Sequence, residues 1–363
     1  MKSIVALIFL FSPFLISFQS NKQFIKPVGD SIHYSREKHF KNVRQLTFGA
    51  DNAEAYWSFD GKHISFQSNN KDWGLSCDQI FYMPIDGMDL NNGIKPQLIS
   101  TGMGRTTCAF FLPNGKSILY ASTHLGGKEC PKDVERTPGG KYLWPIYDSY
   151  DIFVADLSGK ITKQLTRSTG YDAEATVSPK GDKIIFTSTR NGDLDLYVMD
   201  TNGENVKQIT HELGYDGGAF FSPDGKKIVF RASRFKSDEE KKEYLDYLKQ
   251  GLVAPIAMEI FTRNVDGSDL KQITNLGKAN WAPFYHPSGK KIIFSSNYKG
   301  KRGFEFNLFM INEDGSELEQ ITYDKVFDSF PMFSPDGKKI LFSSNRNNRG
   351  TRNTNLFVAD WID

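Results

Sequence analysis

The sequence is poor in the residues that build metal centres and reactive nucleophile sites. Its 363 residues include three cysteines and six histidines, and the histidines are scattered along the chain. This distribution disfavours a site in which several histidines hold a metal ion. No G-x-S-x-G motif occurs, so a serine peptidase of that type is not expected. The formal net charge is only +2, which gives no argument for binding nucleic acid.

Long hydrophobic runs are also missing, with one exception at the N-terminus. Lys2 precedes an apolar run from Ile4 to Phe18, which Pro13 interrupts. A short apolar run behind a positive charge is typical of an export signal, and we assign residues 1–20 to a signal peptide. The small residues there form no clear cleavage pattern, so an uncleaved anchor is the alternative. We therefore expect a periplasmic or secreted protein with no membrane span in the mature chain.

A short turn recurs six times after a lead-in at residues 21–41. It reads SFDGK, LPNGK, SPKGD, SPDGK, HPSGK and SPDGK, beginning at residues 58, 112, 178, 222, 286 and 334. The tripeptide QLT, QLI or QIT precedes each turn, beginning at residues 45, 97, 164, 208, 272 and 320. The repeating unit is about 44 residues long, and the second and fourth units carry insertions.

Each unit divides into four short strands, as the third unit illustrates. EATVS leads into the turn PKGD, and KIIFTST, LDLYVMD and VKQIT follow as further runs rich in β-branched and aromatic residues. Six such units predict an all-β, six-bladed β-propeller at residues 42–363. The chain begins with a lone fourth strand, NVRQLTF, and ends with a third strand, NLFVADWI. These two segments are expected to complete one blade and close the ring, whereas a stack of open sheets would leave exposed edges.

The repeats resemble the β-propeller repeats of the TolB family, also called PD40 or WD40-like repeats. The resemblance rests on SPDGKKIVF, on the QIT tripeptides and on NLFMINEDGSELEQIT, and it covers roughly residues 42 to 363. It implies the propeller fold. It also implies a choice of functions, because such repeats occur beside peptidase and lyase catalytic units.

Propeller geometry predicts two different faces. The Pro-Gly turns and Asp-Gly hairpins lie on one face, and the loops between blades, together with both insertions, lie on the other. The second-unit insertion runs from Thr123 to Tyr150, and the fourth-unit insertion from Arg234 to Met258. The latter contains a predicted helix at residues 237–250, which Ser237 caps and Gly251 ends. We expect the functional site on this loop-rich face.

Polar residues recur where the inner strands begin. Six residues before each turn stand Asn52, Thr106, Asp172, Asp216, Asn280 and Asp328, which we expect to ring the channel mouth. Two positions further on stand Glu54, Cys108, Glu174, Gly218, Ala282 and Phe330, and Tyr171 and Tyr215 adjoin two of the aspartates. One interpretation is structural, because short polar side chains cap loops. The other is an acidic funnel for a polar ligand or a cation, and oxygen ligands would suit Ca²⁺.

Further candidates surround the second-unit insertion. His124 and Asp148 flank it and could act as an acid–base pair, or His124 merely orders the loop. Arg105, Arg190 and Arg231 could form a polar pocket on the same face. The aromatic residues Trp73, Trp144, Tyr147 and Trp281 could stack on a peptide or sugar, or fill the space between blades.

The three cysteines permit one disulfide in an oxidising compartment and leave one free thiol. All three pairings of Cys77, Cys108 and Cys130 remain open, and we favour Cys108–Cys130, which would pin the second-unit insertion.

Two functions follow from these observations. The first is a non-catalytic binding or scaffold module of the cell envelope, with a protein, peptide or glycan as partner and no cofactor. The second is a glycan lyase or hydrolase that uses the loop-rich face. A closed ring needs no partner to bury its edges, so we expect a monomer.

Overall fold

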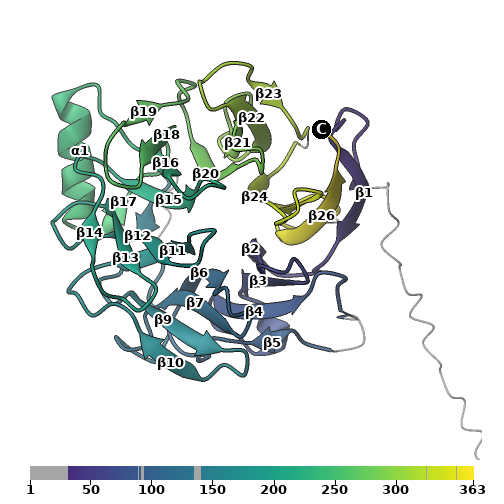
Figure 1. Ribbon diagram of the computed structural model, residues 1–363, viewed down its shortest axis with the longest axis horizontal. Helices are drawn as coiled ribbons and strands as arrows, with labels where there is room; N and C mark the ends of the chain where they lie inside the picture. Colours follow the sequence, from purple (N-terminus) through teal and green to yellow (C-terminus); the bar gives the residue numbers. More distant parts are fainter. Residues whose placement is uncertain (1–31, 89, 91–93, 135–139, 324, 349) are drawn as a thin grey trace, which may run out of the picture.

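The chain forms a six-bladed β-propeller, as the sequence predicts. The computed structural model describes residues 32–88, 90, 94–134, 140–323, 325–348 and 350–363. Six four-stranded antiparallel sheets surround a central axis (Figure 1). The proposed signal peptide lies outside the described residues. Within them, no helix is long and apolar enough to cross a bilayer.

Five blades are built from consecutive segments of chain, each running outward from the axis. Blade 1 contains β2 (Asn52–Trp57), β3 (His63–Ser68), β4 (Gln79–Pro84) and β5 (Gln97–Leu98), with a short 3₁₀ helix, η2 (Lys71–Trp73). Blade 2 contains β6 (Thr106–Phe111), β7 (Ser117–Ser122), β9 (Asp151–Asp156) and β10 (Ile161–Gln164). Blade 3 contains β11 (Asp172–Val177), β12 (Lys183–Ser188), β13 (Asp195–Asp200) and β14 (Lys207–Gln208). Blade 4 contains β15 (Asp216–Phe221), β16 (Lys227–Ala232), β18 (Glu259–Asn264) and β19 (Lys271–Gln272). Blade 5 contains β20 (Asn280–Tyr285), β21 (Lys291–Ser296), β22 (Asn307–Asn312) and β23 (Glu319–Gln320).

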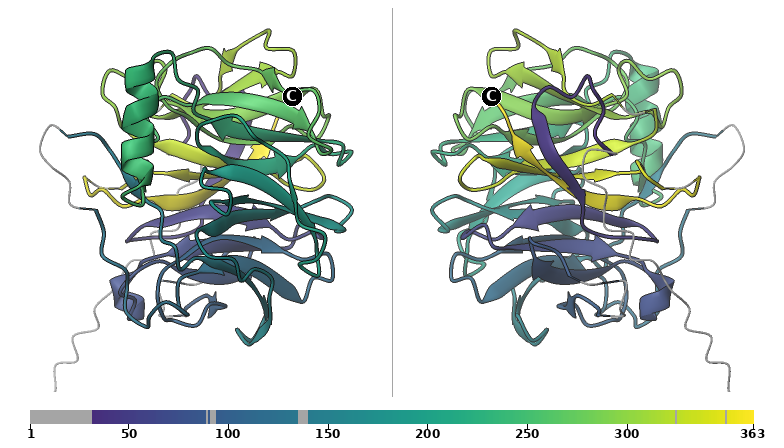
Figure 2. Two further views of the ribbon diagram at one scale, coloured as in Figure 1. Left: turned by 90° about the vertical axis from the view of Figure 1, so that its left-hand side faces the viewer. Right: turned by 90° about the vertical axis from the view of Figure 1, so that its right-hand side faces the viewer.

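Blade 6 joins the two ends of the chain. It contains β24 (Asp328–Phe333), β25 (Lys339–Ser344) and β26 (Asn355–Trp361), and its outer strand is β1 (Phe40–Gln45). Phe40 pairs with Trp361 in an antiparallel register, so the first strand lies against the last (Figure 2). The predicted closure is therefore confirmed, and β1 begins two residues before the expected start of the propeller.

The recurring tripeptide has a structural role in every blade. Its threonine, or the following serine in blade 1, accepts a hydrogen bond from a backbone N–H of the third strand. In blade 3, Thr210 Oγ1 accepts from the Leu196 N–H at 2.8 Å and donates to Asp195 at 3.0 Å. The same bond occurs in the other blades at Thr47, Ser100, Thr166, Thr274 and Thr322. It satisfies buried backbone groups where the short outer strand ends.

The recurring turn is held by its own side chains. In blade 4, Ser222 Oγ donates to Asp224 Oδ1 at 2.6 Å, and the Lys226 N–H donates to the same carboxylate at 3.0 Å. Gly225 has φ +72°, a conformation that favours glycine, since it has no Cβ. This chemistry explains why the turn SPDGK recurs.

The two insertions meet on the loop-rich face. The fourth-blade insertion contains α1 (Asp238–Leu248), which stands at the rim of the disc (Figure 2), and Ser237 caps it as predicted. Its strand β17 (Leu252–Val253) pairs with β8 (Trp144–Pro145) of the second-blade insertion. Lys141 and Glu243 add an ion pair at 2.5 Å between the two insertions. The two insertions therefore support each other.

Candidate functional site

Each inner strand contains a bulge at its third residue. The register with the second strand shifts there in all six blades. The bulged residues all have positive φ: Glu54 (53°), Cys108 (45°), Glu174 (57°), Gly218 (59°), Ala282 (47°) and Phe330 (53°). A bulge redirects the side chain of its residue. All six positions consequently line one cavity on the propeller axis.

This cavity has a volume of about 350 Å³, and ten of its lining residues are aromatic. The second-blade insertion contributes Tyr142 and residues 144–147 to its lining. Trp144 lies 5.3 Å from Trp281 between ring centroids, so blade 2 reaches blade 5 across the axis. The other aromatic residues of the lining are Tyr56, Tyr150, Tyr171, Tyr215, Phe220 and Phe330.

A buried ion pair occupies one side of the cavity. Arg231 Nη2 donates to Glu174 Oε1 at 2.5 Å and lies 2.7 Å from the Tyr215 hydroxyl, which itself donates to Glu174 at 2.7 Å. Burial opposes ionisation of Glu174, but the Arg231 charge holds the pKa of this carboxyl below its usual value. A Cβ on Gly218 would lie 1.8 Å from Arg231 Nη1. The glycine at the bulge therefore makes room for the guanidinium.

Glu54 lies in the same cavity without an arginine of its own. Its Oε2 accepts from the Cys108 thiol at 3.2 Å and from the Tyr56 hydroxyl at 3.4 Å. Burial raises the pKa of Glu54 to about 7; the negative charge of Glu174 adds to this effect, and the Cys108 hydrogen bond opposes it. Burial and the neighbouring Glu54 also raise the pKa of the Cys108 thiol. At neutral pH Glu54 is thus partly protonated, whereas Glu174 is ionised.

Asp78 and Arg105 add a second, looser pair to the lining. Arg105 Nε lies 3.9 Å from Asp78 Oδ2, and Arg105 Nη1 lies 2.7 Å from the exposed Asp133. Burial raises the pKa of Asp78, and the Arg105 charge opposes this rise. The charged residues of the lining are therefore three carboxyl groups and two arginines: Glu54, Asp78, Glu174, Arg105 and Arg231.

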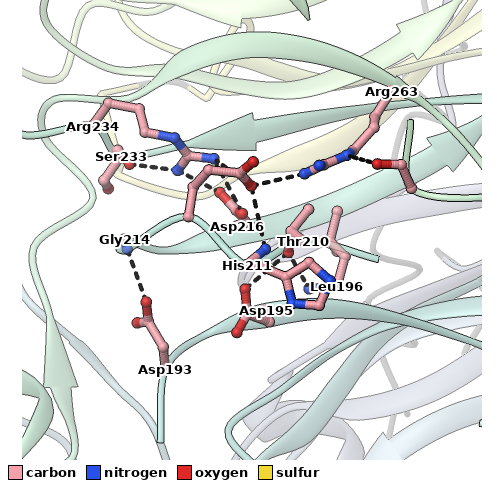
Figure 3. A network of polar contacts seen from close by, with 12 residues as sticks. Asp193, Asp195, Leu196, Thr210, His211, Gly214, Asp216, Ser233, Arg234 and Arg263 are labelled. Atoms are coloured by element: carbon pink, nitrogen blue, oxygen red, sulfur yellow. Dashed lines mark hydrogen bonds and ion pairs between the residues drawn. The ribbon is translucent and has the colours of Figure 1, made fainter. Parts of the chain in front are cut away.

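Five of the six polar residues predicted to ring the channel mouth do not line the cavity. Asp172, Asp216 and Asp328 are fully buried and lie outside the cavity lining. Each pairs with an arginine two residues beyond the second strand: Arg190 at 3.0 Å, Arg234 at 2.6 Å and Arg346 at 2.9 Å. Figure 3 shows Arg234 over Asp216 in blade 4.

Asn52 and Asn280 are also buried, bonded locally and outside the cavity lining. Thr106 is buried and donates to the Asp78 carbonyl at 2.9 Å, but it also contributes to the cavity lining. The capping interpretation therefore describes the other five residues of the set. The bulge explains the error, because it directs the residue two positions further on, rather than these, towards the axis.

In blade 6, the equivalent Asp328–Arg346 ion pair also includes a carboxyl group from the lead-in segment before β1. Arg346 also binds Glu37 at 2.9 Å, and all three side chains are fully buried. Burial raises the pKa of Glu37, an effect that Arg346 opposes. This triad fastens the segment before β1 to the closing blade.

The proposed His124–Asp148 pair does not form. His124 Nδ1 lies 2.9 Å from Ser122 Oγ, and its ring packs 4.5 Å from that of Phe153. Asp148 is exposed, shares no hydrogen bond with His124, and neither residue lines the cavity. Burial lowers the pKa of His124. His124 therefore orders the start of the insertion, the alternative that the sequence left open.

The preferred disulfide is also wrong. Cys77 pairs with Cys130, with a Cα–Cα distance of 5.8 Å, and Cys108 is a free thiol. Cys108 occupies the bulge of β6, which turns it towards Glu54 and away from the loops. The disulfide instead ties the second-blade insertion to the loop before β4.

The remaining sequence candidates divide between the cavity and the blades. Glu54, Arg105, Tyr171, Glu174, Tyr215 and Arg231 line the cavity, as do Trp144, Tyr147 and Trp281. Arg190 belongs to the Asp172 pair, and Trp73 packs 5.1 Å from Phe81 within blade 1. Sequence reasoning missed Tyr56 and Asp78 and assigned Cys108 to a disulfide rather than to the cavity. Cys108 stands at the recurring position two residues into the inner strand, the same position as Glu54 and Glu174.

Comparison with known proteins adds a family and a set of similar folds. The family model described as TolB beta propeller domain matches residues 145–246 and 232–351, more than half of the chain. A protein assigned as TolB from Agrobacterium tumefaciens is similar at 19% identity and a TM-score of 0.56, covering 86% of this chain and 91% of that one. TolB from Acinetobacter baumannii matches at 19% identity and 0.57, covering 84% and 65%. A gluconolactonase from Xanthomonas campestris matches at 12% identity and 0.56, covering 91% and 93%. At these identities the solved structures support the fold alone.

Proposed function

Because this chain belongs to the TolB beta-propeller family, we propose that it is a non-catalytic binding module whose ligand enters the cavity on the axis. The ligand is a small molecule or the end of a peptide or glycan. One observation carries the proposal: residues from all six blades converge on a single cavity that an insertion of the same chain helps to enclose. Its volume lies within the range of ligand pockets, and its aromatic walls with a few polar groups have the usual composition of such pockets.

The proposed place of action is the periplasm or the extracellular space. The export signal predicted at residues 1–20 supports it, and so does the Cys77–Cys130 disulfide, because such bonds persist in oxidising compartments. A partner protein of the cell envelope would present the group that enters the cavity.

A second candidate function is acid–base catalysis on a glycan or peptide. The observation that favours it is the contrast between Glu54, with a pKa of about 7, and Glu174, whose pKa lies below its usual value. Two carboxyl groups with opposite shifts in one cavity are the pattern of a general acid beside an ionised partner. His124 and Asp148 have no part in this version of the enzyme hypothesis.

The test is a thermal-shift screen of glycan and peptide libraries with three proteins: wild type, Trp144→Ala and Trp73→Ala. Trp144 lines the cavity and Trp73 packs inside blade 1, so the second variant controls for losing a tryptophan. We expect stabilising ligands whose effect disappears only in Trp144→Ala. Equal responses in all three proteins would contradict a site in the cavity. Product formation over time, abolished in Glu54→Gln, would replace the binding module with the enzyme.

A further inference from the structure

Glu54 differs from the other carboxyl groups that lie deep in the propeller. Asp172, Asp216, Asp328 and Glu37 each have an arginine, and Glu174 has Arg231. Asp195 accepts from Thr210 and Gln208 in the recurring motif. Glu54 receives only a thiol and a phenol on one oxygen, and its other oxygen has no hydrogen bond among the described residues. Glu54 therefore lacks the arginine that five of these six other carboxyl groups have.

The groups that face Glu54 leave a deficit of positive charge. They are Cys108 from β6, Tyr56 from β2, Glu174 from β11, Arg231 from β16 and Asp78 before β4. Arg231 already forms an ion pair with Glu174 at 2.5 Å, and Arg105 forms ion pairs with both Asp78 and the exposed Asp133. With three carboxyl groups and two shared arginines in the lining, a positively charged ligand would gain Coulomb energy.

Three polar atoms of the lining are buried without hydrogen-bond partners, an arrangement that a ligand would complete. Gln67 Oε1 is an acceptor without a donor, and Nε of Arg105 and Nε of Arg231 are donors without an acceptor. The Arg231 side chain is only 7% exposed. Unpaired buried polar groups are costly, so each of the three indicates a missing partner. A ligand that carries N–H or C–H donors together with an acceptor would satisfy them.

The aromatic lining already accommodates one cation. The Arg231 guanidinium lies 5.4 Å from the Trp144 ring centroid and 5.0 Å from that of Tyr215. Such ring faces attract organic cations. Among the described residues, no group of three or more His, Cys, Asp or Glu side chains could hold a metal ion. The surroundings of Glu54 therefore suit an organic cation better than a metal ion.

We propose that the ligand of the cavity carries an ammonium group, which binds between the Glu54 carboxylate and the aromatic walls, with a hydroxyl or carboxylate acceptor directed to Arg231. This inference rests on the proposed binding function and specifies the chemical class of its ligand. The ammonium group has two sources, a small amine or the amino terminus of a peptide.

Protonation of Glu54 competes with the ligand. In the protein without a ligand the pKa of Glu54 is about 7, so at lower pH the carboxyl group must lose a proton before it pairs with a cation. A permanently charged ligand should therefore bind about tenfold more weakly at about pH 6 than at about pH 8, since each unit below the pKa costs a factor of ten. An anionic ligand would show the opposite dependence.

The experiment is a ligand-observed NMR titration with the full mature chain. The probes are choline and its uncharged isostere 3,3-dimethylbutan-1-ol, a tripeptide with a free or an acetylated amino terminus, and calcium chloride. Each is measured at about pH 6 and about pH 8. We expect choline or the free peptide to bind at least tenfold more tightly than its uncharged counterpart, and which of the two binds identifies the source. The affinity should rise with pH.

The matched variants are Glu54→Gln, which keeps the shape but loses the charge, and Asp148→Asn, which makes the equivalent change at an exposed carboxyl group outside the cavity lining. Glu54→Gln should lose both the preference for charge and the pH dependence, and Asp148→Asn should retain them. Equal binding of the isosteres, tighter binding of calcium, or no binding by any cation at millimolar concentration would overturn the ammonium assignment. If the Trp144-dependent screen still finds uncharged or anionic ligands, the proposed function stands without it.

Discussion

Replacing Gly218 with alanine tests whether the bulge glycine holds the Glu174–Arg231 pair in place. The new Cβ would lie 1.8 Å from Arg231 Nη1, and the residue would keep φ +59°. The dihedral alone costs about 1 kcal/mol, because a Cβ is crowded in this region. If the guanidinium is displaced, breaking the buried pair adds about 3 kcal/mol or more. We therefore expect a loss of about 4–6 kcal/mol in the free energy of unfolding.

The measurement is urea unfolding followed by tryptophan fluorescence, with Ala282→Gly as the matched control. Ala282 occupies the same bulge position in blade 5 with φ +47°, so removing its Cβ relieves the dihedral and removes no ion pair. Its effect should stay within about 1 kcal/mol of zero. If Gly218→Ala also lowers the free energy of unfolding by only about 1 kcal/mol, the Arg231 side chain has moved without breaking its ion pair with Glu174. The ion pair would then not depend on the glycine.

Four further perturbations follow from single contacts. Arg346→Ala should lower the free energy of unfolding in urea by about 3–5 kcal/mol, because it leaves the buried Glu37 and Asp328 carboxyl groups without their arginine. A loss below about 1 kcal/mol would contradict this expectation. Cys130→Ser should lower stability by about 2–4 kcal/mol, since the disulfide closes a loop with a sequence separation of 53, whereas Cys108→Ser should not. Thr210→Val should cost about 1 kcal/mol by leaving the Leu196 N–H unpaired, which faster amide exchange at that residue would report. Glu54 has a folded pKa raised to about 7, so wild-type stability should fall as pH rises from about 4.5 to about 7, and Glu54→Gln should remove about 1–3 kcal/mol of that fall; parallel pH profiles would refute it.

The blade architecture was predictable because its signals are local. The serine and aspartate of SPDGK fold their own turn, and the threonine of QIT binds the backbone of the neighbouring strand in the same blade. The cap at Ser237 and the helix after it follow the same logic. These interactions span few residues or recur with the period of the repeat, so their residue types mark the structure directly.

Two of the errors, the channel-mouth residues and the disulfide, share one cause, a single bulged residue in each inner strand. A regular strand alternates its side chains between two faces, so the first polar residue of the strand appeared to face the channel. The bulge with positive φ instead turns the third residue to the axis, and an arginine beyond the second strand covers the first. The same turn placed Cys108 beside Glu54 and left Cys77 to pair with Cys130.

By itself the sequence determined the number of blades, the closure of the ring and the position of both insertions, because these depend on repeated local patterns and on the need to bury strand edges. Only the tertiary structure decided which side chains share the cavity and what charge each carries. Glu54 and Glu174 are the same residue type at the same position of two blades. Arg231 reaches one of them because Gly218 leaves it space, and that difference arises from packing between blades that no single repeat encodes.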